Sequence, residues 1–400
     1  MVDMPNSKTA LFIGINQRYI NATNALLPAV VQHTYFLHFY GPGFVSQSTL
    51  DQGIDRYVDA IGGVDLIVVI AQCIVISDPA RINHFLRNYT SLLNGGHVTA
   101  EYLNDVQAFC KKNKQKVVCS IAEVDPHSTA QSTLDSILEH AGYFMGWGNG
   151  FLNASGDMVA VNSEKYIQKQ LKKGFKLGLI DDFANKYRRQ FINLGHFVGA
   201  NEFYWGALST RKYDISVPGS RYARRRTVSK LLGKLDGVHV GGTAYSYAYK
   251  IAQRLGLRPY AKFYLVHLYN LAFQRLLSQS KACVTEGGAN NYPVRKFFEI
   301  PAAGALMVCW PAIGLEALGF KNGVNCIFVR NEREIARTAK ALVHDGDQFE
   351  GIAAAGRNLV FRKHSVFARA LQFQDAIRSI DAGTFMGSSW EEGKFRCRLE

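Results

Sequence analysis

Short apolar runs alternate with helical patterns along the chain, and this alternation constrains the fold more than any other feature. In the first half the runs cover residues 10–15, 34–40, 65–71, 116–122, 142–147 and 191–198. Enough chain lies between successive runs for a crossover helix or loop, which predicts parallel strands. The run 66–70 is apolar throughout, as is typical of a strand buried on both faces.

The second half of the chain repeats this pattern. Strand-like runs cover residues 213–217, 237–240, 261–266, 282–285, 305–309 and 325–329, and helical patterns cover residues 224–235, 245–255, 270–278, 332–343, 349–361 and 365–380. Because 400 residues exceed what one hydrophobic core usually serves, we predict an α/β protein of two Rossmann-like domains. The predicted domains are 1–206 and 207–380, with a tail, 381–400, that could pack back on the first domain. Ligands would bind in the cleft between the domains.

The positive charge of the chain is concentrated in its middle. Residues 165–275 hold 21 lysines and arginines against five acids, a net charge of +16, while the whole chain carries +14. This excess predicts an anionic partner, which could be a nucleotide diphosphate, an anionic membrane surface, an anionic polymer or a nucleic acid. The basic segment 165–176 could dock on an anionic membrane, or it could be the solvated face of a helix.

The cysteines indicate a reducing compartment. The seven cysteines contain no Cys-x-x-Cys pair, and most lie in strand-like runs, where a thiol packs as a small apolar group. We find neither a signal peptide at the start of the sequence nor an apolar stretch that would span a membrane. The sequence therefore predicts a cytoplasmic protein.

A basic residue and an acidic residue at helical spacing mark a candidate binding site. Arg295 and Glu299 would share one face of a short helix that leads into the strand-like run 305–309. A carboxylate there can accept hydrogen bonds from a sugar diol, and a guanidinium can hold a phosphate oxygen. The alternative is an i,i+4 ion pair on a solvated helix face.

Two loops that follow predicted strands could converge on the same ligand. Gly219 and Ser220 form a turn after the run 213–217, and the helix that follows opens with three arginines, the first of which is Arg224. Such a turn can bring the backbone and the arginines close to a phosphate, or it can be a plain turn beside a solvated helix. Three further candidates follow the run 282–285, and these are Glu286, Gly287 and Tyr292.

The first domain offers candidates for a general base. Asp125 and His127 follow the run 116–122, so they would lie at the carboxyl end of a strand, facing the cleft. Either side chain could take a proton from an attacking hydroxyl, although an Asx-Pro turn explains the same residues. Asn16, Gln17 and Arg18 could add polar contacts there. The Asp-x-Asp pattern at residues 345–347 lies between two helical patterns, and we interpret it as a turn rather than a metal site.

The second half also resembles a known family. The segment 295–304, Arg-Lys-Phe-Phe-Glu-Ile-Pro-Ala-Ala-Gly, resembles the Arg-x-x-Phe-Glu-x-x-Ala-x-Gly signature of the CgeB-like (spore maturation type) glycosyltransferases. Further segments resemble motifs of that family in the same order, at residues 217–220, 271–285, 353–360 and 364–369. The resemblance covers about residues 213–375.

The resemblance implies a GT-B fold, in which the second domain holds a nucleotide-sugar donor, such as a UDP-sugar, without a metal ion. It implies that Glu299 accepts hydrogen bonds from the ribose, and that Arg295 or the Gly219 turn meets the diphosphate. The backbone around His267 would face the base. Related retaining enzymes carry a second glutamate where this chain has Asn291, so the resemblance leaves retention or inversion open.

The expected function is therefore a metal-independent glycosyltransferase that acts on a glycan or a lipid-linked acceptor. It would work in surface polysaccharide synthesis at the inner face of the membrane. Two alternatives remain at this stage: a basic nucleic-acid-binding protein, and a sugar-nucleotide epimerase of the same fold. We expect no nucleic-acid partner.

Overall fold

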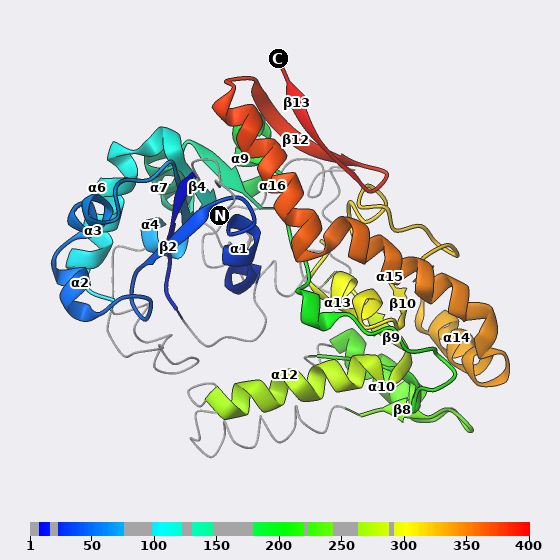
Figure 1. Cartoon of the computed structure of the whole chain (residues 1–400). Helices are drawn as coiled ribbons and strands as arrows, with labels where there is room; N and C mark the ends of the chain where they lie inside the picture. Colours follow the sequence, from blue (N-terminus) through cyan, green and yellow to red (C-terminus); the bar gives the residue numbers. More distant parts are fainter. Residues whose placement is uncertain are drawn as a thin grey trace, which may run out of the picture.

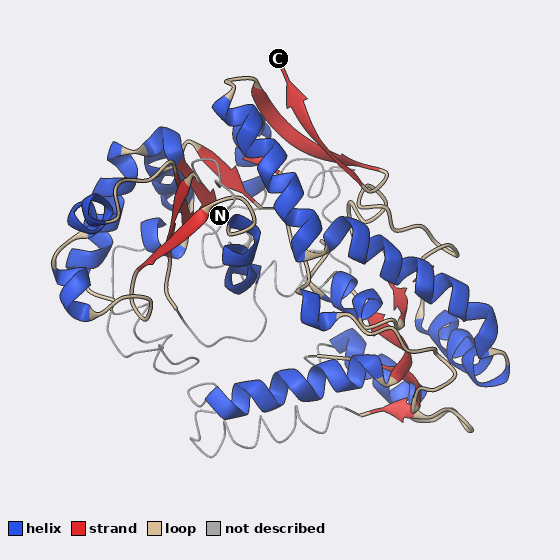
Figure 2. Cartoon of the chain, viewed as in Figure 1, coloured by secondary structure: helices blue, strands red, loops and turns tan. Residues whose placement is uncertain are grey.

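The computed structural model of the chain contains two parallel β-sheets surrounded by helices (Figure 1, Figure 2). It describes residues 8–16, 23–75, 98–121, 130–146, 179–219, 223–242, 263–287 and 292–400. None of the helices in this part of the chain is long and apolar enough to cross a membrane.

The first sheet has the strand order β2-β1-β3-β4-β5-β6, and all neighbouring strands are parallel. Its strands are β1 (Thr9–Ile13), β2 (Phe36–Tyr40), β3 (Leu66–Ile70), β4 (Val117–Ser120), β5 (Tyr143–Met145) and β6 (Phe191–Ile192). The described helices of this half are α1 (Thr23–Val31), α2 (Gln47–Asp51), α3 (Ile54–Ala60), α4 (Gln72–Val75), α6 (Ala100–Lys112), α7 (Gln131–His140) and α9 (Leu179–Lys186), with the 3-10 turns η1 (Lys114–Lys116) and η2 (Arg188–Gln190). Every residue of β3 is buried, because this strand lies inside the sheet.

The second sheet has the strand order β11-β10-β9-β7-β8 and is also parallel. Its strands are β7 (Tyr213–Ser216), β8 (Val240–Gly241), β9 (Ser280–Thr285), β10 (Leu306–Cys309) and β11 (Ile327–Phe328). The described helices are α10 (Ala223–Leu232), α12 (Phe263–Ser278), α13 (Lys296–Ala302), α14 (Glu332–His344) and α15 (Glu350–His364), with the 3-10 turn η6 (Gly346–Phe349). A further 3-10 turn, η3 (Ala200–Glu202), lies in the connection between the two sheets.

The end of the chain returns to the first sheet. Helix α16 (Val366–Asp381) packs against α1, and it is followed by a hairpin of β12 (Phe385–Glu391) and β13 (Lys394–Leu399) (Figure 1). The Ser388 hydroxyl accepts from the Asn193 amide at 2.6 Å, and the Trp390 indole donates to the Asn193 carbonyl at 2.7 Å. Through these contacts the hairpin packs against the residue that directly follows β6 in the chain.

The predicted fold is confirmed: two Rossmann-like domains with parallel sheets, the GT-B architecture. β6 ends at Ile192 and β7 begins at Tyr213, and the domain boundary at residue 206 stays a prediction within this connection.

One predicted strand was wrong, one was too long, and one hairpin was missed. The run 261–266 was predicted as a strand, but residues 263–266 form the first turn of α12. Periodicity cannot separate a short apolar strand from a buried helix, and no Gly or Pro interrupts residues 263–278. Residues 193–198 leave the sheet after β6, and within them Val198 forms an isolated bridge to Ser365.

Candidate functional site

The candidate site lies where β7 and β9 end. These strands are neighbours, with Ser216 paired to Cys283, so the loops at their carboxyl ends lie next to each other. The first loop contains Gly219 and leads to α10, and the second contains Glu286 and Gly287. The two loops that the sequence singled out therefore meet at one edge of the second sheet.

Gly219 allows a lysine to reach the turn. Its φ of +89° lies in the left-handed region, which favours glycine. A Cβ atom at this position would lie 2.5 Å from Cε and 2.9 Å from Nζ of Lys296. The ammonium group of Lys296 thus occupies the space that a side chain at residue 219 would fill.

Three cations surround one buried carboxylate at this turn. Arg224 and Arg225, at the start of α10, lie 3.8 Å and 3.6 Å from the carboxylate oxygens of Glu286. The guanidinium of Arg224 also stacks over the ring of Trp310, 4.7 Å from its centroid. Burial, and then the positive charge of Arg225, lower the pKa of Lys296 to about 8. Within the described residues no carboxylate lies within ion-pair distance of Lys296, so the cluster has a surplus of positive charge.

The sequence did not single out Lys296, although it indicated the turn that Lys296 contacts. The residue stands between Arg295 and the apolar face of α13, at the first position of that helix. A lysine at this position in the motif 295–304 was the available signal.

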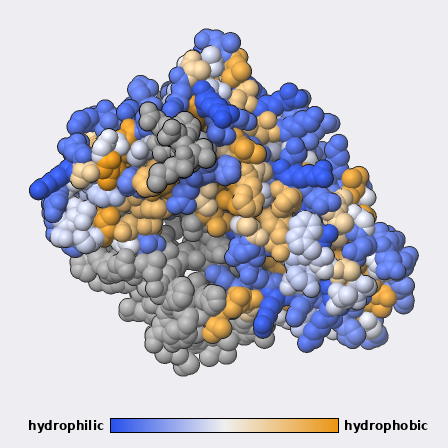
Figure 3. All heavy atoms as spheres, viewed as in Figure 1, coloured by the Kyte–Doolittle hydropathy of each residue, from blue (hydrophilic) through white to orange (hydrophobic). Residues whose placement is uncertain are grey.

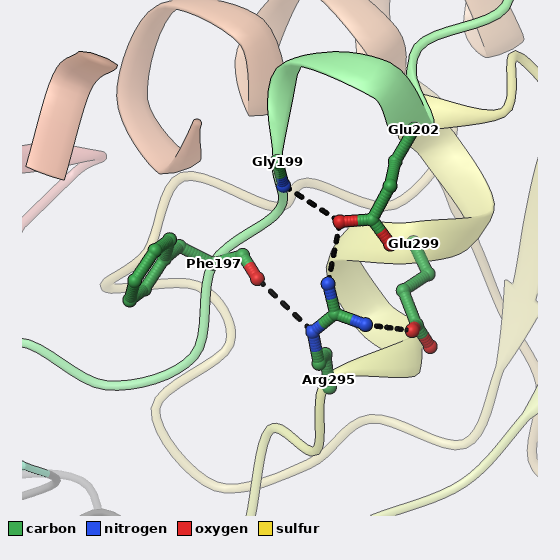
Figure 4. Close-up of polar contacts among 5 residues, drawn as sticks. All are labelled: Phe197, Gly199, Glu202, Arg295 and Glu299. Atoms are coloured by element: carbon green, nitrogen blue, oxygen red, sulfur yellow. Dashed lines mark hydrogen bonds and ion pairs between the residues drawn. The ribbon is translucent and has the colours of Figure 1, made fainter. Parts of the chain in front are cut away.

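Arg295 and Glu299 form an ion pair that is buried rather than solvated (Figure 4). Arg295 also donates to a carboxylate oxygen of Glu202 at 2.5 Å and to the Phe197 carbonyl at 3.2 Å. The same Glu202 oxygen accepts from the Gly199 amide at 2.6 Å. One guanidinium therefore joins α13 to the connection that follows the first sheet.

This cluster holds two carboxylates and one guanidinium. Burial raises the pKa of Glu202, and the negative charge of Glu299 adds a smaller increase. The positive charge of Arg295 opposes this shift. The resemblance implied that Arg295 could bind the diphosphate, but its guanidinium donates to three protein groups. Its neighbour Lys296 faces the Gly219 turn instead.

Glu299 also lines a cavity of about 220 Å³. The cavity lies between the connection around η3 and the second half of α12, and its lining includes Glu202, Tyr204, Gln274 and Arg275. Glu299 therefore contacts Arg295 and faces an open space.

Other predicted site residues lie elsewhere or outside the described residues. Tyr292 stacks on His196, with centroids 6.2 Å apart, and burial and Arg295 lower the pKa of that histidine to about 3. The structure does not describe Asp125, His127, Ser220, Asn291, Gln17, Arg18 or the segment 165–176, and of His267 it describes only the helical backbone. Asn16 donates to the Gly43 carbonyl at 3.1 Å.

The motif at residues 364–369 forms buried hydrogen bonds that have a structural role. His364 Nε2 lies 2.8 Å from the Leu318 carbonyl, which can only accept, so Nε2 carries the proton and Nδ1 accepts from Arg369. Arg369 is fully buried, donates to the His196 carbonyl at 3.1 Å and stacks over Trp390. Burial lowers its pKa to about 9. These contacts tie α16 to both the first domain and the hairpin.

Across the described ranges, no three His, Cys, Asp or Glu side chains lie close enough to hold a metal ion together. Asp345, from the Asp-x-Asp pattern, directly follows α14, and Gly346 and Asp347 lie in the 3-10 turn η6.

Residues 220–375 match the family model described as "Glycosyl transferase-like". A search of curated proteins gives no match. Among solved structures, HepE from Anabaena in complex with UDP has a TM-score of 0.52 and 13% identity, over 93% of this chain and 100% of HepE. An alpha-glucosyltransferase in complex with UDP-glucose and DNA containing an abasic site has a TM-score of 0.50 and 10% identity, over 94% and 99% of the two chains.

These comparisons agree with the two-domain architecture, and the family match falls on the segment that holds the cation cluster. The finer spore maturation type stays a prediction. The chain thus has the GT-B fold, and residues 220–375, in its second half, are similar to a glycosyltransferase family.

Proposed function

We propose that the chain transfers a sugar from a nucleoside-diphosphate donor to a hydroxyl acceptor, and that Arg224, Arg225 and Lys296 hold the diphosphate. The observation that carries this proposal is the surplus of positive charge around the Gly219 turn, at the carboxyl ends of β7 and β9. In open parallel sheets, ligands bind at this edge.

The chemistry explains why cations are needed there. During transfer the bond between the anomeric carbon and the diphosphate oxygen breaks, and the electron pair leaves with the diphosphate. The acceptor oxygen forms the new bond and loses its proton. Cations fixed beside the departing diphosphate stabilise the charge that develops on it, a task that a metal ion performs in other transferases. We propose that this enzyme needs no metal.

Glu299 is the proposed ribose ligand. It lines the 220 Å³ cavity beside α13, and Arg295 fixes its carboxylate. Structures of two proteins that share the fold contain UDP or UDP-glucose, which makes UDP the first nucleotide to test. Asp125 and His127 remain the proposed bases if the reaction inverts the anomeric centre.

The acceptor and the cellular role are proposals of the same kind. We propose a glycan or lipid-linked acceptor, a role in surface polysaccharide synthesis, and a cytoplasmic enzyme at the inner face of the membrane. The basic middle of the sequence supports contact with an anionic partner.

Calorimetric titration with UDP, GDP, CMP and dTDP would test the donor site. We expect one of these nucleotides to bind. Arg225→Ala and Lys296→Ala should each raise its Kd by roughly 10- to 100-fold, which is the usual effect of losing a hydrogen bond to a charged group. Lys340→Ala, at an exposed position on α14, is the matched control.

Two results would contradict the assignment. If none of the nucleotides binds, or if Lys296→Ala changes the Kd no more than Lys340→Ala does, the cluster is not the diphosphate site. An unchanged Kd in Glu299→Ala would remove Glu299 from the ribose site. Donor consumption without an acceptor, and with release of a changed sugar nucleotide, would favour the epimerase alternative.

A further inference from the structure

An exposed aromatic cluster lies between the connection of the two sheets and the end of α15. Phe203 packs against Trp205 and Phe361, with ring centroids 6.4 Å and 5.4 Å apart, and Trp205 meets Phe361 at 5.7 Å. Trp205 is 56% exposed and Phe361 is 43% exposed. These three aromatic rings thus pack together, with two of them partly open to solvent.

The apolar surface continues onto α16. Phe367 and Leu371, one helical turn apart, are 52% and 54% exposed. In Figure 3, apolar side chains gather over α16 and over the adjoining end of α15, on the face turned toward the viewer. We call Trp205, Phe361, Phe367 and Leu371 the elbow surface, because α15 and α16 join there.

The exposed side of α15 is distinct from its packed side. Leu359 lies on the inner side, within reach of a Cβ placed at Gly319 or at Gly393. Phe361 follows two residues later, about 200° around the helix, and therefore points away from that contact. Its exposure reflects the outward face of the helix, where Arg362 is also exposed.

Most of the charges around the elbow surface are positive. Residues 351–374 contain Arg357, Arg362, Lys363 and the buried Arg369, and they contain no acid. Arg357 lies over the Trp205 ring, 4.5 Å from its centroid. In the described part of the chain, no carboxylate lies within ion-pair distance of Arg357, Arg362 or Lys363. Glu350 is near enough to oppose the lowering of the Arg357 pKa by burial, and Asp375 is exposed one turn after Leu371.

We propose that the elbow surface docks on an anionic phospholipid membrane. Tryptophan and phenylalanine insert at the boundary between headgroups and acyl chains, and each nearby lysine or arginine adds attraction to anionic lipid. A second copy of this chain fits less well, because two elbow surfaces would bring six positive charges together. The elbow surface shares no residue with the donor cluster or with the segment 165–176, so the proposal does not depend on either.

Vesicle sedimentation tests the proposal with the full-length protein. We expect binding to vesicles of phosphatidylglycerol and phosphatidylcholine, little binding to phosphatidylcholine alone, and weaker binding as salt rises. Trp205→Ala with Phe361→Ala should weaken binding about tenfold or more, and so should Arg362→Glu with Lys363→Glu.

Matched controls separate this surface from general hydrophobicity and charge. Phe36 is 61% exposed on β2 of the first sheet, and Phe36→Ala should leave vesicle binding unchanged. Arg337→Glu with Lys340→Glu makes the same change of charge on α14 and should weaken binding much less. Each variant is first shown to keep the wild-type melting temperature.

Tryptophan fluorescence gives a second readout that does not require removal of a large side chain. Trp205 is exposed while Trp310 and Trp390 are buried, so membrane contact should shift the emission of Trp205 to the blue. Trp205→Phe should abolish the shift but keep binding within about threefold.

Three outcomes would overturn the proposal. These are an absence of binding to anionic vesicles, equal losses in the elbow variants and their controls, and a wild-type shift that survives Trp205→Phe. A dimer in solution that Phe361→Glu dissociates, without vesicle binding by the monomer, would instead identify the elbow surface as a contact between copies.

Discussion

At the scale of single residues, the most consequential side chain is Lys296. It reaches the Gly219 turn, and burial together with Arg225 lowers its pKa to about 8. The protonated amine is the form that binds an anion, so nucleotide affinity should be constant below about pH 7.5 and fall above pH 8. Above pH 8 the affinity should fall by up to tenfold per pH unit, because the protonated fraction of the Lys296 amine falls by that factor.

Titrations of UDP between pH 7 and pH 9.5 would measure this dependence. Lys296→Arg is the informative variant, since a guanidinium remains protonated across this range and should flatten the profile. Uridine lacks phosphate and serves as the ligand control, because it reports any effect of pH on the contacts of the base and the ribose alone. A wild-type profile that stays flat for UDP would show that the Lys296 ammonium does not contact the phosphates.

The residues of the Arg295 cluster show how far sequence reasoning reached. The i,i+4 spacing predicted that Arg295 and Glu299 meet, and the structure confirms their ion pair. It could not predict Glu202, which lies 93 positions away in sequence and is brought to Arg295 by the course of the chain between the sheets. Contacts of this kind depend on tertiary packing, which no local pattern encodes.

At the scale of elements, strands buried on both faces were predicted best. β3 and β10 carry continuous apolar runs, and their predicted and observed positions differ by one or two residues. The C-terminal hairpin was missed because its turn is carried by Glu392 and Gly393, both with positive φ, and Glu is not a typical residue at such a position. The apolar start of α12, residues 263–266, was mistaken for a strand, since so short an apolar run suits either structure.

The packing of α13 against α15 provides a prediction at this scale. Gly356 lies on the side of α15 that packs against α13, and a Cβ there would lie 2.5 Å from the Asn325 carbonyl oxygen. Gly356→Ala should therefore lower the free energy of unfolding by about 1–3 kcal/mol, because backbone must move to admit the methyl group. Urea denaturation monitored by circular dichroism would measure the loss.

Gly351 on the same helix is the matched control. A Cβ at Gly351 meets no atom within 4 Å, so Gly351→Ala should raise stability by up to about 1 kcal/mol through helix propensity alone. Equal effects of the two substitutions would mean that the approach of Asn325 to α15 does not limit the packing.

At the scale of the whole molecule, the two domains are joined at several points besides the covalent connection. Arg295 bonds to Phe197 and Glu202, Arg369 bonds to His196, and the hairpin bonds to Asn193. Each contact falls on residues 193–202, the segment that follows β6. This segment is therefore the place where the second domain and the C-terminal hairpin are attached to the first sheet.

Trp390 is the central side chain of the hairpin attachment. Its indole donates to the Asn193 carbonyl, and its ring packs against His364 and Arg369. Trp390→Ala should lower the free energy of unfolding by about 3–5 kcal/mol, as expected when a large aromatic side chain is removed from a packed site. It should also speed proteolytic cleavage within residues 193–212, because the attachment of that segment is lost.

The expected selectivity of this effect makes it a test of the architecture. Below the melting temperature, Trp390→Ala should bind UDP as the wild type does, because Lys296 and Arg225 lie in the second domain and do not contact the hairpin. Trp390→Phe keeps a ring but not the hydrogen bond to Asn193, and it should cost only about 1 kcal/mol. If Trp390→Ala weakens UDP binding as much as Lys296→Ala does, the hairpin attachment and the donor cluster are not independent, and the donor site extends to the attachment of the two domains.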